Sequence, residues 1–131
     1  MDNIGLYVVI TLAVIFVTPY LYMHISAMRA VGKSVPINDL FVENHADPDK
    51  NVYAYFMSKN CSMCKPMTPV IEKLKTDNSN IVIIDINQNP ELAKEFHIYG
   101  TPTLMAIRDG FIKKVKLGKL SLKKLEQFIA D

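Results

Sequence analysis

The hydrophobic pattern divides the chain into one long apolar stretch at the start and several short apolar runs further on. From Ile4 to Met23 there is no Asp, Glu, Lys or Arg. A helix of this length would be about 30 Å long, which matches the hydrocarbon core of a bilayer. Tyr20 and Tyr22 stand near its end, where interfacial tyrosines are expected. The pattern therefore predicts a single membrane-spanning helix.

A cleaved signal peptide is the main alternative for this stretch. Such a peptide has a basic start, an apolar core of about 7–15 residues and a small-residue cleavage site. Here no Lys or Arg precedes the apolar run, the run is longer, and its exit from His24 to Arg29 offers no good cleavage site. A buried core helix is a third interpretation, but the rest of the chain looks complete without it. We therefore expect an uncleaved anchor.

The charges beside the apolar stretch indicate its orientation. Arg29 and Lys33 follow it, and no Lys or Arg precedes it. Because positive charge collects on the cytoplasmic flank of a membrane helix, the following residues are predicted to be cytoplasmic. An extracytoplasmic (periplasmic) domain stays open as the alternative, since two charges are a small bias. The predicted location is a single-pass membrane protein with a cytoplasmic domain.

Further along, apolar runs of strand length alternate with amphipathic segments. Runs rich in β-branched and aromatic residues predict four strands, and these are Val52 to Met57, Ile81 to Ile86, Thr103 to Arg108 and Phe111 to Leu117. Asp109-Gly110 separates the last two runs and is a hairpin signal. The third and fourth strands should therefore be antiparallel neighbours.

Apolar residues at helical spacing predict the elements between the strands. Helices are expected from about Cys61 to Lys75, from Pro90 to about His97, and in the last segment, capped by Ser121. Pro69 falls inside the first of these helices and should kink it. Gly32 to Pro36 is expected to be a short linker, and Ile37 to Val42 a helical turn begun by Pro36.

The resulting order is strand, helix, strand, helix, strand, strand, helix. The first crossover requires a parallel pair of strands with right-handed connection. The final hairpin and helix complete an α/β open sheet with helices on both faces. Two regions are expected: residues 1–34 form the transmembrane anchor and linker, and residues 35–131 form the folded domain.

Composition narrows the classes of function. A chain of 131 residues has room for one domain and an appendage. The formal charge of +2 gives no indication of nucleic-acid binding. Two cysteines are too few for a disulfide scaffold and two ligands short of a closed structural zinc site. We expect a monomer with no cofactor, no metal and no nucleic-acid partner.

The two cysteines, Cys61 and Cys64, are separated by two residues and follow the first predicted strand. At the start of a helix, unpaired N–H groups and the helix dipole favour the thiolate, which is the nucleophilic form. Cys61 would then attack a substrate disulfide, and Cys64 would resolve the mixed disulfide. The alternatives are a structural disulfide, a thiol-binding module, and a metal (copper) carrier assisted by Met57, Met63, Met67 and His97.

Several motifs are similar to those of the thioredoxin family and occur in the same order. They are Cys61-Ser62-Met63-Cys64-Lys65, Pro69, Asp85-Ile86-Asn87-Gln88-Asn89-Pro90, Gly100-Thr101-Pro102-Thr103-Leu104 and Asp109-Gly110. The resemblance covers roughly residues 50 to 131. It implies a thioredoxin fold and a cis bond between Thr101 and Pro102. It also implies that these two residues lie beside the cysteine pair and offer backbone groups to an extended substrate.

Four features depart from the family pattern. Asn60 stands where the family typically has Trp, and Ser62-Met63 stands where it usually has Gly-Pro. Tyr55 replaces a buried Asp, and Ile83 replaces a Lys on the neighbouring strand. In the family this Asp and Lys are thought to help move a proton to and from the second cysteine. We therefore expect disulfide exchange with a redox poise of its own.

Together these patterns predict a membrane-anchored thiol–disulfide oxidoreductase. Cys61 and Cys64 would be its catalytic residues, and Thr101 and Pro102 would bind the substrate. The expected partners are protein thiols or disulfides, the membrane, and a reductase or other electron donor.

Overall fold

The computed structural model describes residues 3–35, 46–47 and 49–130. The helical turn expected between Ile37 and Val42 lies outside the described residues. The described elements follow the predicted order along the chain. They are α1 (Asn3–Met28), β1 (Val52–Met57), α3 (Thr68–Asp77), β2 (Ile81–Asp85), α4 (Pro90–Glu95), β3 (Thr103–Arg108), β4 (Phe111–Leu117) and α5 (Leu122–Ala130).

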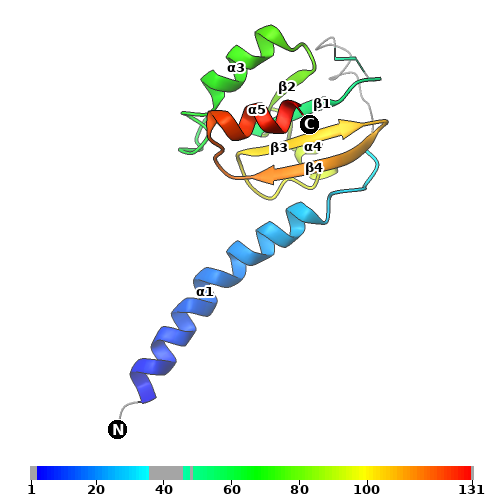
Figure 1. The fold of residues 1–131 in the computed structure, drawn as a ribbon. Helices are drawn as coiled ribbons and strands as arrows, with labels where there is room; N and C mark the ends of the chain where they lie inside the picture. Colours follow the sequence, from blue (N-terminus) through cyan, green and yellow to red (C-terminus); the bar gives the residue numbers. More distant parts are fainter. Residues whose placement is uncertain (1–2, 36–45, 48, 131) are drawn as a thin grey trace.

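The strands form one sheet in the order β2-β1-β3-β4 (Figure 1). β1 and β2 are parallel, because α3 carries the chain back across the sheet before β2 begins. β3 pairs antiparallel with β1 and with β4. Asp109 and Gly110 both have positive φ and form the tight turn of the hairpin. The predicted open α/β sheet of the thioredoxin type is confirmed.

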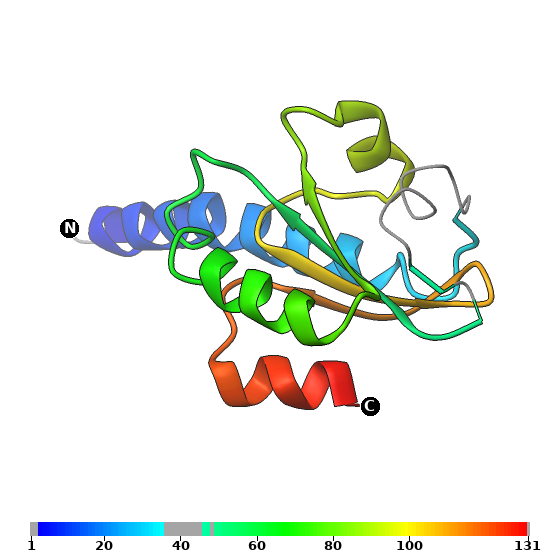
Figure 2. The ribbon, with the colours of Figure 1, turned by 90° about the horizontal axis from the view of Figure 1, so that it is seen from above.

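Helices cover both faces of the sheet, as Figure 2 shows, with α3 and α5 on one side and α4 on the other. Alternate residues of β1 supply the two cores. Ala54 and Phe56 pack on the α4 side with Phe96, which follows α4. Tyr53 and Tyr55 pack on the side of α3 and α5. The alternation arises because successive side chains of a strand point to opposite faces.

The helix after β1 begins later than the sequence predicts. Residues 62–67 form consecutive turns, and α3 starts only at Thr68. Pro66 and Pro69 have no N–H group to donate, so regular helical bonding cannot run through this segment. Pro69 consequently lies in the first turn of α3, where proline is tolerated, and not in a kinked interior. The cysteines therefore precede the helix instead of forming its first turn.

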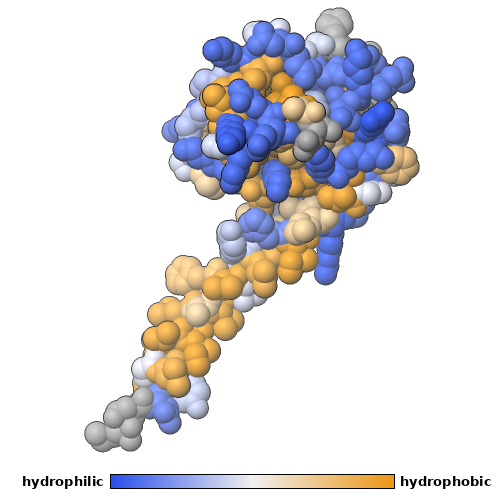
Figure 3. All heavy atoms as spheres, viewed as in Figure 1, coloured by the Kyte–Doolittle hydropathy of each residue, from blue (hydrophilic) through white to orange (hydrophobic). Residues whose placement is uncertain are grey.

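α1 is the long apolar helix expected at the N-terminus, and it continues to Met28. It is long and apolar enough to cross a membrane, and its most apolar window is exposed along its whole length. Figure 3 shows apolar residues over most of the visible face of this helix, while the visible face of the domain is mostly hydrophilic. Only its last turns are buried, at Ser26 and Ala27.

The segment after α1 is paired with β4 and is not a free linker. The N–H of Gly32 donates to the carbonyl of Ile112 (2.8 Å), and the N–H of Ile112 donates to the carbonyl of Lys33 (3.0 Å). The N–H of Val35 donates to the carbonyl of Gly110 (2.8 Å). These bonds cover part of the exposed edge of the sheet. Backbone pairing, which involves no special side chains, therefore holds the described residues from Gly32 to Val35 in place.

Candidate active site

The turn after β1 carries a disulfide between Cys61 and Cys64. Their Cα atoms are 5.2 Å apart, within the normal range for a disulfide. Cys64 has no exposed surface, while Cys61 is partly exposed. The two sulfur atoms therefore differ in access, and a molecule approaching from outside meets Cys61 first.

A side-chain contact between two loops holds the start of this turn. The side-chain amide of Asn87 donates to Ser58 Oγ (2.8 Å). Ser58 Oγ also accepts the N–H of Asn60 (3.3 Å), and the Ser58 carbonyl accepts the N–H of Cys61 (3.1 Å). Ser58 and Asn87 are site residues that the sequence analysis missed. The signal was present, since Asn87 lies in a motif shared with the family, but its partner is distant in sequence.

The Cys61 sulfur lies between two backbone groups. The N–H of Cys64 donates to Cys61 Sγ (3.2 Å), and the carbonyl oxygen of Thr101 lies 3.4 Å from the same sulfur. A hydrogen bond from an N–H group favours the charged form of an acceptor. The Cys64 N–H is thus placed to stabilise a Cys61 thiolate when the disulfide is reduced. This local donor takes the role that the sequence analysis gave to the helix end.

The loop before β3 is rigidly held beside the disulfide. The bond between Thr101 and Pro102 is cis, which confirms the geometry implied by the resemblance. The Pro102 carbonyl accepts the N–H of Gly118 (2.8 Å), and Thr103 Oγ1 donates to the Gly100 carbonyl (2.7 Å). The structure therefore brings all four predicted site residues together, although Cys61 and Thr101 are 40 positions apart in sequence.

A short hydrogen-bonded chain connects the core to the buried cysteine. Thr68 Oγ1 donates to the Cys64 carbonyl (2.9 Å). The Tyr55 hydroxyl lies 3.2 Å from the same Oγ1, so Tyr55 must be the donor in that contact. Burial raises the pKa of Tyr55, and its hydroxyl stays neutral at pH 7. Tyr55 is therefore a fixed donor at neutral pH and not a base.

The strand register supports the comparison of Tyr55 with the family's buried Asp. Tyr55 and Ile83 are direct partners in the parallel pair of β1 and β2. The two positions that hold the Asp and Lys pair in the family are therefore adjacent in this structure as well. Here they hold Tyr55 and Ile83, and neither side chain ionises near neutral pH. A proton on Cys64 would have to move by another route.

Two large apolar or aromatic side chains are exposed in the cysteine turn and in the loop before Pro102. Met63, between the cysteines, is 49% exposed, and Tyr99, in the loop before Pro102, is 51% exposed. Met67, by contrast, is buried in the core of the α3 side. Within the part of the chain that the structure describes, no group of three or more His, Cys, Asp and Glu residues is placed to hold a metal ion.

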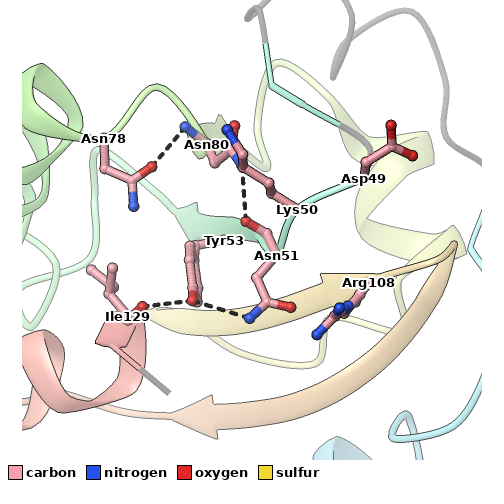
Figure 4. Close-up of a pocket in the computed structure, with 8 residues that line it drawn as sticks. All are labelled: Asp49, Lys50, Asn51, Tyr53, Asn78, Asn80, Arg108 and Ile129. Carbon is pink, nitrogen blue, oxygen red and sulfur yellow. Dashed lines mark hydrogen bonds between the residues drawn. The ribbon is translucent and has the colours of Figure 1, made fainter.

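A second pocket lies at the other end of the sheet, around the start of β1 (Figure 4). Several of its polar groups are paired with one another. Asn80 donates to the Asn51 carbonyl (3.2 Å), and the Tyr53 hydroxyl donates to the carbonyl of Ile129 (2.6 Å). Since β1 runs from this pocket to the cysteine turn, the two sites are at opposite ends of the strand. We assign this pocket a structural role.

Comparison with known proteins agrees with this geometry. The thioredoxin family model matches residues 34–131. The thioredoxin of Rhodospirillum rubrum is 31% identical over 56% of this chain and 74% of its own length. The thioredoxin of Bacillus subtilis (strain 168) is 31% identical over 60% of this chain and 78% of its own.

Among solved structures, Fasciola hepatica thioredoxin superposes with a TM-score of 0.60 at 24% sequence identity. The match covers 70% of this chain and 86% of that one, and it shows the same fold. The sequence relationship extends over the cysteine turn, the cis-proline loop and the closing helix. The chain therefore belongs to the thioredoxin family and is a thiol–disulfide oxidoreductase with a redox-active Cys61–Cys64 pair.

Proposed function

We propose that the protein is a membrane-anchored thiol–disulfide oxidoreductase in which Cys61 attacks, Cys64 resolves, and the Thr101–Pro102 loop orients the substrate backbone. One observation carries the proposal. The disulfide has one partly exposed sulfur and one fully buried sulfur, and the exposed one lies beside the Thr101 carbonyl. Such an arrangement distinguishes the attacking thiol from the resolving thiol.

In the reducing direction, the Cys61 thiolate attacks one sulfur of a substrate disulfide. A Cys61–substrate disulfide forms, and the other substrate sulfur leaves as a thiolate that takes up a proton. The Cys64 thiolate then attacks Cys61 Sγ, and the second substrate thiol is released. The substrate gains two electrons, and the protein becomes the disulfide form described here. A dithiol reductase or other electron donor returns two electrons to the pair, and the same steps run backwards in the oxidising direction.

Backbone groups supply the positioning in this proposal. An extended substrate that pairs with Thr101 would bring its sulfur to the side of Cys61, because the Thr101 carbonyl is already 3.4 Å from that atom. The hydrogen bonds from Gly118 to the Pro102 carbonyl and from Thr103 to the Gly100 carbonyl hold this loop beside the cysteine turn. The substrates are protein thiols and disulfides, and the domain acts as a monomer.

α1 is the anchor in this proposal. None of its most apolar window is buried within the described part of the chain, and burial in lipid would remove that surface from water. Arg29 and Lys33 follow the span, and the charge bias favours a cytoplasmic domain over a periplasmic one.

Trapping in cells tests the assigned roles. Cys64→Ala should accumulate mixed disulfides on Cys61, and Cys61→Ser should form none and lose disulfide exchange. A Cys64→Ala protein that traps no partner would contradict the roles.

Carbonate extraction of membranes tests the anchor. Release of the protein from the membrane, shortened or intact, would contradict an uncleaved anchor. A membrane-impermeant thiol reagent tests the side: labelling of reduced Cys61 in cells with a permeabilised outer membrane would overturn the cytoplasmic assignment.

A further inference from the structure

α1 ends against the loop that carries the cis proline. The rings of Tyr22 and Tyr99 meet edge to face, with centroids 6.3 Å apart. Gly100 approaches the helix so closely that a Cβ there would lie 2.8 Å from Met23 Cε. In Figures 1 and 2 alike, the loop leading into β3 passes beside α1. The contact joins the proposed membrane helix to the site loop itself.

The helix is held in this position by more than one contact. Ala27 and Ala30 are buried against the domain, and the backbone of Gly32 and Val35 is bonded to the β4 hairpin. Small side chains at the buried positions allow a close approach of the helix. The direction of α1 relative to the sheet is therefore set by packing and hydrogen bonds, and the domain does not hang on a flexible tether.

The position of this contact along α1 determines the height of the site above the bilayer. The apolar span runs from Ile4 to Met23, so Tyr22 and Met23 mark its membrane–water boundary. Tyr99 and Gly100 pack on these two residues, and Thr101, the next residue, contacts Cys61. Three consecutive loop residues thus connect the bilayer boundary to the reactive sulfur.

The orientation of the domain and its exposed side chains agree with an active site at the height of the membrane–water boundary. In both ribbon views, the end of the domain with the turn between β1 and α3 points toward the N-terminal side of α1, and the β3–β4 hairpin points away (Figures 1 and 2). Two exposed side chains on this end of the domain are apolar or aromatic: Met63, between the cysteines, and Tyr99, two residues before Thr101. Tyrosine is enriched at membrane interfaces, where its ring is apolar and its hydroxyl is hydrated.

We propose that the active site is held at the membrane surface and that its substrates are cysteines of membrane proteins located within a few residues of the bilayer. This inference rests on the proposed function, and it names the substrate class. The reaction is the two-electron exchange described above. A rigidly held site has a high effective concentration toward a cysteine at the same height and a very low one toward a cysteine held far above it.

A single tryptophan measures the height directly, because the chain contains no Trp. The full-length variants Tyr99→Trp and Phe111→Trp are reconstituted into vesicles whose headgroups carry a spin label that quenches indole fluorescence. Phe111 is 44% exposed and begins β4 at the hairpin, so it is the matched control. We expect at least twofold stronger quenching at position 99. Equal quenching, or stronger quenching at position 111, would overturn the inference.

A pair of membrane-spanning peptides tests the substrate class. One carries a disulfide directly outside its span, and the other carries it beyond a helical spacer of about twenty residues, or about 30 Å. The reduced, reconstituted protein should reduce the near disulfide at least tenfold faster than the far one.

A Gly/Ser linker of about twenty residues inserted between His24 and Ile25 should remove this preference, because it separates the membrane span from the domain. The same linker appended at the C-terminus should leave it unchanged.

The outcomes separate the two proposals. Equal rates on both peptides, or a preference that survives the inserted linker, would overturn the substrate class and leave the oxidoreductase function standing. If the protein reduces neither peptide and also fails to reduce a soluble disulfide, both the proposed function and this inference are overturned. Exchange between the linker variant and the soluble disulfide serves as the control for folding, and flotation with the vesicles is the control for anchoring.

Discussion

The Tyr55 hydroxyl lies 3.2 Å from Thr68 Oγ1, and the same Thr68 oxygen donates to the carbonyl of the buried Cys64. Where the family has a buried Asp, this chain has a neutral donor that supports the backbone of the cysteine turn. The contact joins β1 to α3 at the point where the two prolines interrupt regular helical bonding. The hydrogen bond between Tyr55 and Thr68 should therefore contribute to the free energy of unfolding.

Thr68→Val removes the acceptor of Tyr55 and the donor to Cys64 with little change of shape. We expect the free energy of unfolding to fall by about 1–3 kcal/mol, because the buried Tyr55 hydroxyl is left without a partner. Urea unfolding of the oxidised protein measures this loss. Tyr55→Phe should cost less, and the double variant should cost less than the sum of the two. Additive losses would show that the two hydroxyls do not interact.

The same burial predicts how stability depends on alkaline pH. Because burial raises the pKa of Tyr55 above the value near 10 of the unfolded chain, its stabilising contribution is complete below about pH 10. It is lost as the pH rises through the folded-state pKa. Unfolding measured between about pH 9 and 11 should show a smaller alkaline loss in Tyr55→Phe than in the exposed control Tyr99→Phe. Equal losses in both variants would contradict the assignment.

Asn87→Ala removes the amide that holds Ser58 at the start of the cysteine turn. We expect a fall in the exchange rate of about 2- to 10-fold, corresponding to one lost hydrogen bond of about 0.5–1.5 kcal/mol. Stability should change little, because Asn87 is exposed. Single-turnover reduction of a peptide disulfide is the measurement, with the exposed neighbour Gln88→Ala as control. An unchanged rate would mean that the turn holds its shape without this contact.

Asn80→Ala tests the structural role of the second pocket. Asn80 is buried and bonds to the Asn51 carbonyl and to the N–H of Asp47. Its loss should lower the free energy of unfolding by about 1–3 kcal/mol, since backbone groups lose their partners. The exchange rate of the folded variant should equal that of the native protein, because the pocket lies at the opposite end of β1. A changed rate in folded protein would assign this pocket a part in the reaction.

Local sequence patterns predicted the elements that depend on local physics. The runs at Val52, Ile81 and Thr103 became strands as expected, and Asp109-Gly110 became the hairpin turn. Each is specified by β-branched or turn residues within a few positions. The start of α3 was wrong because the cysteine turn has helical spacing, although its prolines cannot complete the bonding.

Contacts between distant segments could not be predicted in this way. Ser58 meets Asn87 only because β1 and β2 are parallel neighbours that end at the same edge of the sheet. The pairing of Gly32 with Ile112 is made by backbone atoms, which carry no sequence signature. Tyr55 could be identified as a departure from the family, but its donor role required the position of Thr68.

The sequence alone determined that the protein has a reactive cysteine pair after a buried strand, a proline loop similar to the family's, and an apolar helix of membrane-spanning length. Those features depend on residue type and short spacing. Only the tertiary structure decided that the end of α1 rests on the loop beside Cys61. The physical reason is that sheet pairing and close packing bring together residues that are about eighty positions apart, and no local pattern encodes such a contact.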